Sequence, residues 1–203
     1  MQNTERVPKA THGRLPIYLD YLISIKDNKE NISATALARE LGLGEVQVRK
    51  DLNAVSGEGR PKTGYVIEDL IGKLEEYLGI HNLRKAVLVG AGKLGKALLD
   101  YDGFSEYGIE VSAAFDIALT DKAITENNKP IYPMERFSSY CAENNVNIGI
   151  ITVPKGEAQS VCNLMTENGI MYIWSFVQET LKVPDKVKVK QENLALSIAH
   201  LTK

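Results

Sequence analysis

The sequence is poor in the residues that cross-link secreted proteins or hold metal ions. Its 203 residues include two cysteines, Cys141 and Cys162, and three histidines, His12, His81 and His200. Two cysteines at this spacing match neither a disulfide framework nor a metal-ligand cluster. We therefore expect two buried thiols in a reducing compartment and no metal site. Each histidine stands alone in the chain, so we expect no catalytic residue among them.

Long apolar runs and a strong net charge are also missing. No run approaches the roughly 20 apolar residues of a membrane-spanning helix, and residues 1–8 lack the core of a signal peptide. We expect a cytoplasmic protein with no membrane partner. The net charge of −2 gives no global sign of nucleic-acid binding, so any DNA-binding surface must be a local basic patch. The 44% apolar content is enough for a packed core.

A glycine-rich stretch has the layout of a dinucleotide-binding β-α-β unit. The apolar residues 87–89 lead into a Gly-x-Gly-x-x-Gly segment, a helix-compatible run follows, and a second apolar run ends at Asp116. In such a unit the first glycine permits the turn, the second admits a pyrophosphate and the third lets the helix pack on the strand. Free N–H groups at the helix start face the phosphates. The segment consists of Gly90, Ala91, Gly92, Lys93, Leu94 and Gly95.

Asp116 indicates which dinucleotide this segment would take. It follows Gly95 by about 20 residues, where an acidic side chain accepts hydrogen bonds from the adenosine ribose. A carboxylate there would repel a 2′-phosphate, so NAD and NADH are favoured over NADP(H). Ile117 is a neighbouring candidate contact. The alternative is a plain glycine-rich turn; a P-loop is excluded because Leu94 and Gly95 break its pattern.

Other candidate cofactor contacts follow from strand ends and aromatic residues. Residues 147–153 read as a buried parallel strand, and carboxyl ends of such strands face the ligand. Thr152, Val153 and Pro154 are therefore candidates for the cofactor wall. Tyr101 and Phe176 can stack near a nicotinamide, although a role as core aromatics fits them equally well.

The first third of the chain predicts a helix-turn-helix followed by a wing. Apolar spacing predicts helices over residues 15–26, 34–41 and 45–55, with Ser33 capping the second helix and a glycine turn before the third. Two short helices joined by such a turn are typical of DNA readers. Residues 56–66 would form a hairpin wing. The outward side chains that suit DNA are Gln47, Arg49, Lys50 and Asn53 on the third helix and Arg60 and Lys62 on the wing.

A packing role for this region remains open. Residues 45–62 carry four basic and three acidic side chains, so their net charge is only about +1. This is a small positive charge for a surface that binds DNA phosphates. The alternative is a three-helix domain with a purely structural role, whose charged side chains are only exposed to solvent. On the DNA-binding reading, Gln47 and Asn53 pair with adenine edges, whereas Arg49 and Lys50 reach guanine or phosphate.

These patterns together predict an α/β chain with three parts. Residues 1–80 form a winged helix-turn-helix domain, residues 81–190 a Rossmann-type parallel-sheet domain, and residues 191–203 a C-terminal helix. Within the second part we expect a loop over 120–129 and helices over 134–144 and 155–168. The last helix is apolar, so it must either pack within the chain or form a dimer contact.

Catalysis is not expected. Only about 120 residues follow Arg84, enough for one Rossmann-type unit without a separate substrate domain, and a dehydrogenase also needs an acid or base beside the nicotinamide. The alternatives are a small NAD-dependent oxidoreductase and a scaffold that binds coenzyme A or another phosphate ligand.

The chain resembles the redox-sensing transcriptional repressors called Rex over nearly its whole length. Its markers are residues 8–11 (PKAT), 14–16 (RLP), 47–52 (QVRKDL), 87–95, 113–116 (AAFD) and 151–154 (ITVP). The resemblance implies a homodimer that exchanges its C-terminal helix and binds a palindromic operator in double-stranded DNA. It also implies release when NADH binds, so that the repressor responds to the NADH/NAD⁺ ratio. Lys9 and Arg14 join the candidate DNA-binding residues.

The sequence also departs from the Rex pattern. Residues 53–59 lack the aromatics usual after the recognition helix, Lys93 replaces a common asparagine, and residues 175–178 replace an Asn-Phe-Ala-Pro-type run. Asn193 stands where the family often has an aspartate, which is expected to pair with an arginine that would be Arg14 here. Losing that charge would weaken the contact. A divergent member with a weak redox response is therefore a further alternative.

Overall fold

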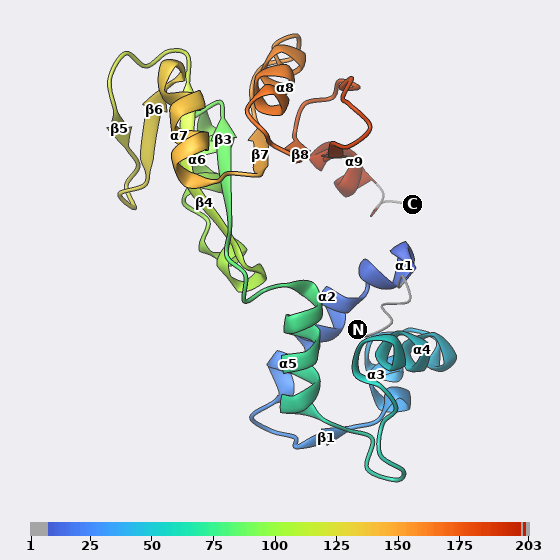
Figure 1. The fold of residues 1–203 in the computed structure, drawn as a ribbon. Coiled ribbons are helices and arrows are strands. Elements are labelled where there is room, and N and C mark those ends of the chain that lie inside the picture. Colours follow the sequence, from blue (N-terminus) through green and yellow to red (C-terminus); the bar gives the residue numbers. More distant parts are fainter. Residues whose placement is uncertain (1–7, 200, 202–203) are drawn as a thin grey trace. The chain divides into compact units, whose positions relative to one another are not determined.

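The structure, a computed structural model, describes residues 8–199 and 201 (Figure 1). The chain divides into two compact units, Met1–His81 and Asn82–Lys203. Among the described residues no helix is long and apolar enough to cross a membrane. The side chain of Lys9 and residue His200 lie outside what the structure describes.

The first unit is a small helical domain with one short ribbon. The helices predicted over residues 15–26, 34–41 and 45–55 are present, within one residue at each end, and a short helix at residues 9–12 was not predicted. Strand β1 (Asn31–Ile32) pairs antiparallel with β2 (Tyr65–Val66). The helices are α1 (Lys9–His12), α2 (Leu15–Ile25), α3 (Ala34–Glu40), α4 (Glu45–Ser56) and α5 (Ile67–Leu78).

The apolar stripes of these helices meet in one core. Leu22, Leu37, Leu52 and Leu74 come from four different helices, and each is fully buried. The Ser33 hydroxyl accepts a hydrogen bond of 3.0 Å from the N–H of Ala36, which confirms the predicted cap at the start of α3. This packing fixes α3 and α4 as the predicted helix-turn-helix.

The wing differs from the predicted hairpin. Within residues 56–66, Arg60 and Gly64 exchange two backbone hydrogen bonds of 2.7 and 2.9 Å around a tight turn. The strand that follows pairs with β1 rather than with the other arm of the turn. Gly64 has a φ of +79°, and a Cβ there would lie 2.3 Å from the Ile32 carbonyl oxygen. This close approach, which sequence pattern does not reveal, anchors the wing.

The second unit is a seven-stranded sheet in the order β5-β6-β4-β3-β7-β8-β9, parallel except for β5. Its strand order departs in both directions from β3, so the switch point lies between β3 and β7, where such sheets bind ligands. The strands are β3 (Arg84–Val89), β4 (Ile109–Asp116), β5 (Ala123–Ile124), β6 (Pro130–Pro133), β7 (Ile148–Ile151), β8 (Tyr172–Ser175) and β9 (Lys188–Gln191).

Each face of this sheet is buried by a separate apolar cluster. Val87 and Val89 join the cluster of α7 (Phe137–Asn144) and α8 (Ala158–Glu167), which also holds both free, buried cysteines. Ala86 and Leu88 point to the opposite face, which α6 (Lys93–Leu99) covers through Leu99. This two-sided burial explains why β3 reads as a continuous apolar run. The α/β fold class predicted from the sequence is confirmed.

Several predicted element boundaries are wrong in this unit. Residues 120–129 are not all loop, because β5 pairs with β6. Two short 3-10 turns, η1 (Asp102–Tyr107) and η2 (Met134–Arg136), also appear, and η2 takes the first turn of the predicted helix over 134–144. The helix predicted from residue 155 begins at Ala158, after a turn. The final helix, α9 (Leu194–Ala199), begins three residues later than the predicted Gln191, because Gln191 is the last residue of β9 and Asn193 caps the helix.

Candidate DNA interface and dinucleotide site

Helix α4 turns its polar side chains outward, as its sequence period predicted. Val48 and Leu52 are fully buried, whereas Gln47, Arg49, Lys50 and Asn53 are exposed. Arg49 forms an ion pair with Glu45 one helical turn earlier. The pair leaves Arg49 at the surface, since more than half of its side chain is exposed.

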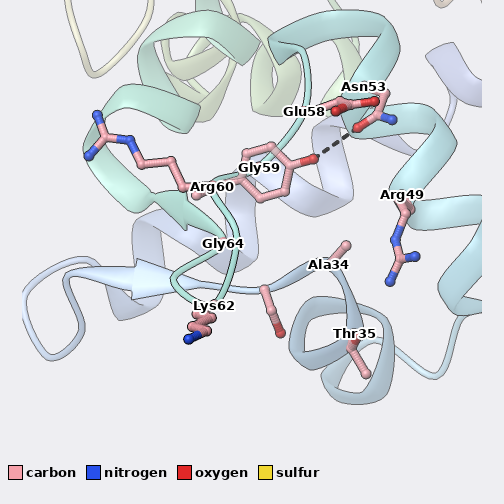
Figure 2. Close-up of a pocket in the computed structure, with 11 residues that line it drawn as sticks. Ala34, Thr35, Arg49, Asn53, Glu58, Gly59, Arg60, Lys62 and Gly64 are labelled. Carbon is pink, nitrogen blue, oxygen red and sulfur yellow. Dashed lines mark hydrogen bonds between the residues drawn. The ribbon is translucent and has the colours of Figure 1, made fainter.

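A groove of about 420 Å³ lies between α4, the start of α3 and the wing (Figure 2). Arg49 and Asn53 enter it from α4, and Arg60 and Lys62 enter it from the wing. The fold thus gathers four of the predicted DNA-contacting residues from two separate segments. Three of the four are cations, and Glu58 also lines the groove, so the lining as a whole carries a net positive charge.

The remaining predicted residues of this surface lie around a second hollow. Arg14, Gln47 and Lys50 line a space of about 650 Å³ beside α1 and α4. Lys50 is exposed there. Arg14 is mostly buried and faces another residue of α4, as follows.

The recognition helix carries a buried carboxylate that sequence analysis did not single out. Asp51 is 4% exposed, and its two oxygens accept hydrogen bonds from Arg14 Nε and Nη2 at 2.8 and 2.9 Å. The hydroxyls of Thr11 and Tyr18 donate to the same carboxylate, each at 2.8 Å. The sequence could have indicated this buried carboxylate, because Asp51 falls on the inward-facing side of the helix between Val48 and Leu52. A charged side chain buried there needs hydrogen-bonding partners.

This network changes the ionisation of its members. Burial raises the pKa of Asp51, but the hydrogen bonds from Arg14, Thr11 and Tyr18 outweigh it and hold the pKa below its usual range. Burial and the hydrogen bond to Asp51 raise the pKa of Tyr18 to about 12. The ionised Asp51 therefore ties α1 and α2 to the recognition helix.

Tyr65 is a second residue that sequence analysis missed. Its hydroxyl donates to Asn53 Oδ1 across 3.1 Å (Figure 2). Its ring lies so close to Gly59 that a Cβ at that position would come within 2.9 Å of it. No local pattern marks this contact, because the pairing of β1 with β2 brings Tyr65 beneath α4.

The glycine segment forms the loop from β3 to α6. Gly90 has a φ of +100°, and a Cβ on it would lie 2.7 Å from the Thr152 carbonyl oxygen. A Cβ on Gly95 would lie 2.0 Å from the Gly90 carbonyl oxygen. A Cβ on Gly92 would meet no atom within 4 Å. The fold itself thus requires two of the glycines, whereas the third borders open space, as close approach of a ligand requires.

Thr152 braces this loop from the end of β7. Its hydroxyl donates to the Gly90 carbonyl oxygen at 2.7 Å, and its backbone N–H donates to the Val89 carbonyl oxygen at 3.0 Å. Val153 packs beside the same turn, within 3.0 Å of where a Gly90 Cβ would stand. Pro154 follows at the surface. The residues predicted as the cofactor wall therefore do lie beside the glycine loop.

Asp116 also contacts this loop. Its Oδ2 accepts a hydrogen bond from the Ala91 N–H at 2.6 Å, and its Oδ1 accepts one from the Ala118 N–H at 2.9 Å. These bonds hold the carboxylate at the end of β4 while the side chain stays partly exposed. Ile117, the next residue, is 84% exposed.

The two predicted aromatic contacts lie at the ends of one chain of four rings. Tyr101 meets Phe104 with ring centroids 5.0 Å apart, Phe104 meets Trp174 at 5.9 Å, and Trp174 meets Phe176 at 4.5 Å. Tyr101 is 60% exposed, whereas the other three rings pack against the apolar cluster under α6. Sequence analysis missed Phe104 and Trp174, whose ring contacts need η1 and β8 to be placed first.

Helix α9, and Leu201 beyond it, present apolar side chains that no described residue of the second unit covers. Leu194, Ile198 and Leu201 are 55%, 66% and 84% exposed. Asn193 caps the helix by accepting from the Leu196 N–H at 2.9 Å, and its amide nitrogen donates to Gln178 at 2.9 Å. Of the two predicted alternatives for this helix, packing within the chain is therefore not seen among the described residues.

The described part of the chain offers no evident catalytic or metal centre. It contains no group of three or more His, Cys, Asp or Glu side chains that could hold a metal ion. His12 contacts the Tyr77 hydroxyl at 3.2 Å, and His81 lies 3.4 Å from Glu75. Burial raises the pKa of the Cys141 thiol to about 11 and also raises that of Cys162, so both thiols stay protonated.

Comparison with known proteins identifies relatives of each unit and of the whole chain. Residues 6–53 match a family described as a putative DNA-binding protein N-terminus, and residues 81–178 match the CoA binding domain family. A redox-sensing transcriptional repressor Rex of Treponema denticola is 39% identical over 97% of this chain and 95% of its own length. The Rex of Bacteroides fragilis is 36% identical over 98% of this chain and 90% of its own length.

Solved structures also show similarity to Rex-family repressors. The structure of RSP in complex with β-NAD⁺ and operator DNA has a TM-score of 0.89 at 31% identity and covers 97% of this chain and 91% of its own. RSP in complex with β-NADH has a TM-score of 0.84 at the same identity, covering 97% of this chain and 93% of its own. A third structure of RSP is described as a Rex-family repressor. The chain therefore belongs to the Rex family of redox-sensing transcriptional repressors, whose members are repressors and not enzymes.

Proposed function

We propose that this chain binds operator DNA as a homodimer and is released when NADH binds, so that it reports the NADH/NAD⁺ ratio. The observation that carries the proposal is the presence in one chain of a basic helix-turn-helix groove and a glycine loop bounded by Asp116. The related RSP, described with β-NAD⁺ and operator DNA and separately with β-NADH, supports the same pairing of ligands.

The dinucleotide fits the loop at the end of β3. The open space at Gly92 admits a pyrophosphate, and the carboxylate of Asp116 accepts hydrogen bonds from ribose hydroxyls with its free lone pairs. The cofactor itself supplies the redox state that is sensed. The proposed contacts are Gly90, Ala91, Gly92, Lys93, Leu94, Gly95, Asp116, Ile117, Thr152, Val153 and Pro154, with Tyr101 and Phe176 as aromatic neighbours of the nicotinamide.

The DNA would lie against α4 and the wing. A helix of this size fits the major groove, and cations on both sides of it can contact phosphates. The proposed contacts are Gln47, Arg49, Lys50, Asn53, Arg60 and Lys62, with Lys9 at the N-terminal side. Arg14 acts indirectly, since its guanidinium is bound to Asp51 and positions α4.

The homodimer would be built on α9. Leu194 and Ile198 of this helix, together with Leu201 beyond it, are more than half exposed, and a second copy that covers them would remove a substantial apolar area from water. On this proposal residues 1–80 bind DNA, residues 81–190 bind the dinucleotide and residues 191–203 dimerise. Two symmetric copies would match a palindromic operator in double-stranded DNA.

A ligand can shift DNA binding only if it binds two arrangements of the dimer unequally. Asn193 bears on this switch, because a neutral amide replaces the aspartate common in the family and is engaged with Gln178. This contact supports a second candidate, a Rex-family repressor whose redox response is weak. It predicts that NADH and NAD⁺ bind with similar affinities.

The match to CoA-binding domains suggests another ligand for the same loop. Coenzyme A carries a phosphate on its ribose, and the Asp116 carboxylate at that edge would repel it. NAD(H) therefore remains favoured.

A titration of the purified protein with NADH, NAD⁺ and coenzyme A tests these candidates, first alone and then with a labelled palindromic operator. We expect NADH to bind tightest and to release the DNA. Similar binding of NADH and NAD⁺ without an effect on DNA would support the weakly responsive repressor, and preferential binding of coenzyme A would overturn the NAD(H) assignment.

A further inference from the structure

The amide of Asn53 is held in one orientation. Its oxygen accepts from the Tyr65 hydroxyl across 3.1 Å, and Figure 2 shows the amide nitrogen turned away from that contact. Burial raises the pKa of the Tyr65 hydroxyl, which keeps it protonated and able to donate to Asn53. The Asn53 NH₂ group therefore faces the groove.

Gln47, six residues earlier on α4, also has its amide oxygen held by the protein. The Gln47 amide faces the guanidinium of Arg14, and its oxygen, once oriented to accept, lies 3.0 Å from Nη1. The single hydrogen of Arg14 Nε donates to Asp51, so Nη1 is the donor to Gln47. A guanidinium has only donors, so the other orientation of the Gln47 amide cannot make this bond. Arg14 is itself fixed by its ion pair with Asp51. Gln47 lines the second hollow beside Gly44 and Lys50, and its NH₂ group is the end of the amide that Arg14 does not engage.

We propose that α4 reads hydrogen-bond acceptors on the DNA, with Gln47 and Asn53 acting as oriented donors beside Arg49 and Lys50. The proposal rests on the proposed DNA-binding function and replaces the expectation that these amides pair with adenine. Recognition of adenine by an amide is bidentate and needs the amide oxygen as well as the nitrogen. Here both oxygens are engaged by Arg14 and Tyr65.

The bases that suit such a surface follow from the major-groove pattern. Guanine presents two acceptors, N7 and O6, and thymine presents the acceptor O4. Adenine and cytosine each place an amino donor in the groove, which would face another donor here. We therefore expect guanine or thymine at the positions that face Gln47 and Asn53. Tyr65 and Arg14 are positioning residues, because they act through the amides and need not touch DNA.

Selection of random double-stranded DNA by the full-length protein with NAD⁺, followed by titrations of single-base variants of the selected site, tests this proposal. N53A and Q47A identify which base pair each amide reads, because preference at that pair should fall about fivefold or more. Because every base pair contains guanine or thymine, base analogues at the identified pair show which group is read. Removing the acceptor of the guanine or thymine should weaken binding by the unchanged protein, whereas removing the amino group of the partner adenine or cytosine should not. Weaker binding after removal of the amino group alone would overturn the proposal.

Two further variants test whether the orientation of the Asn53 amide, and not only its presence, determines the base preference. N53D keeps the shape but has acceptors only, so binding at its base pair should come to depend on the amino group of adenine or cytosine instead of the acceptor of guanine or thymine. Y65F frees the Asn53 amide to rotate, so discrimination between guanine and adenine there should fall by about fivefold or more. A Y65F profile equal to that of the unchanged protein would overturn the orienting role.

Y77F is the matched control, since it removes a tyrosine hydroxyl from the same unit at a contact with His12. It should leave the base preferences unchanged. If the selection enriches no sequence at all, the proposed DNA-binding function fails. If a sequence is enriched but N53A and Q47A change no base preference, only the present inference fails.

Discussion

The Asp116 carboxylate accepts a hydrogen bond from the backbone N–H of Ala91 across 2.6 Å, which joins the end of β4 to the glycine loop. A second bond from the Ala118 N–H holds its other oxygen. The side chain proposed to contact the ribose is thus already fixed by the loop proposed to contact the pyrophosphate. The proposed ribose contact and the proposed pyrophosphate contact are therefore joined by a direct hydrogen bond.

Replacing Asp116 by Ala should weaken NADH binding by about tenfold to a hundredfold, because a hydrogen bond to a charged group contributes about 1.5–3 kcal/mol. The same change should narrow the difference in affinity between NADH and NADPH, since no carboxylate would repel the 2′-phosphate. Fluorescence titration with both nucleotides measures the two effects. Asp121→Asn, an exposed residue beyond the site, is the control. Unchanged selectivity in D116A would contradict the assigned role.

Gly92 and Gly95 should respond differently to the same added methyl group. G95A places a Cβ 2.0 Å from the Gly90 carbonyl oxygen, so it should lower the free energy of unfolding by more than about 1 kcal/mol. G92A meets no protein atom within 4 Å, so its stability should stay within about 0.5 kcal/mol of the original. G92A should nevertheless lose NADH affinity, because the methyl group occupies the space for the pyrophosphate. Urea unfolding and NADH titration of both variants check this. Normal NADH binding by G92A would argue against a ligand at this loop.

Asp51→Asn should destabilise the first unit and weaken DNA binding. It removes the charge that balances Arg14, whose side chain is only 20% exposed, and breaking a buried ion pair costs about 3 kcal/mol or more. Without that network α1 and α4 lose a common anchor. Urea unfolding and operator titration measure the two effects, with Asp27→Asn, an exposed turn residue, as the control. A D51N variant as stable as the original would show that the network adds nothing net.

The same network predicts how stability depends on acid. The folded-state pKa of Asp51 lies below its usual value, so its contribution is complete above the unfolded pKa of about 3.9 and is lost as the pH falls through the folded-state pKa. The difference in unfolding free energy between the original protein and D51N should therefore shrink as the pH is lowered below about 4. Unfolding curves between neutral pH and about pH 3 measure this difference. A constant difference would assign the effect of D51N to packing rather than charge.

Ile198→Glu should dissociate the proposed homodimer. Ile198 is 66% exposed and follows Leu194 by one turn of α9, so a carboxylate there would be buried without a partner if a second copy covers this face. Light scattering coupled to size-exclusion chromatography gives the mass of the particle. Lys186→Glu, an exposed change of charge in the same unit, should leave the mass unchanged. A dimeric I198E variant would place the interface elsewhere.

Much of the fold could be predicted because its signals are local. The stripe of Val48 and Leu52 placed α4 and its outward side chains, and the apolar run before Gly90 placed β3. These features depend on residues within one or two turns of each other. The alternation of Val187 and Val189 with lysines predicted the edge strand β9, but the extra strand β5 was not predicted, because it is short and gains its hydrogen bonds only from β6.

The sequence by itself determined the helix periods, the β-turn-α segment and the acid at the end of the next strand, since glycine conformation and side-chain period act through the nearby backbone. Tertiary structure decided which polar groups meet. Arg14 reaches Asp51 and Tyr65 reaches Asn53 only after separate elements have packed. A hydrogen bond needs two groups within about 3 Å at a favourable angle, and packing alone sets such distances between residues far apart in the chain.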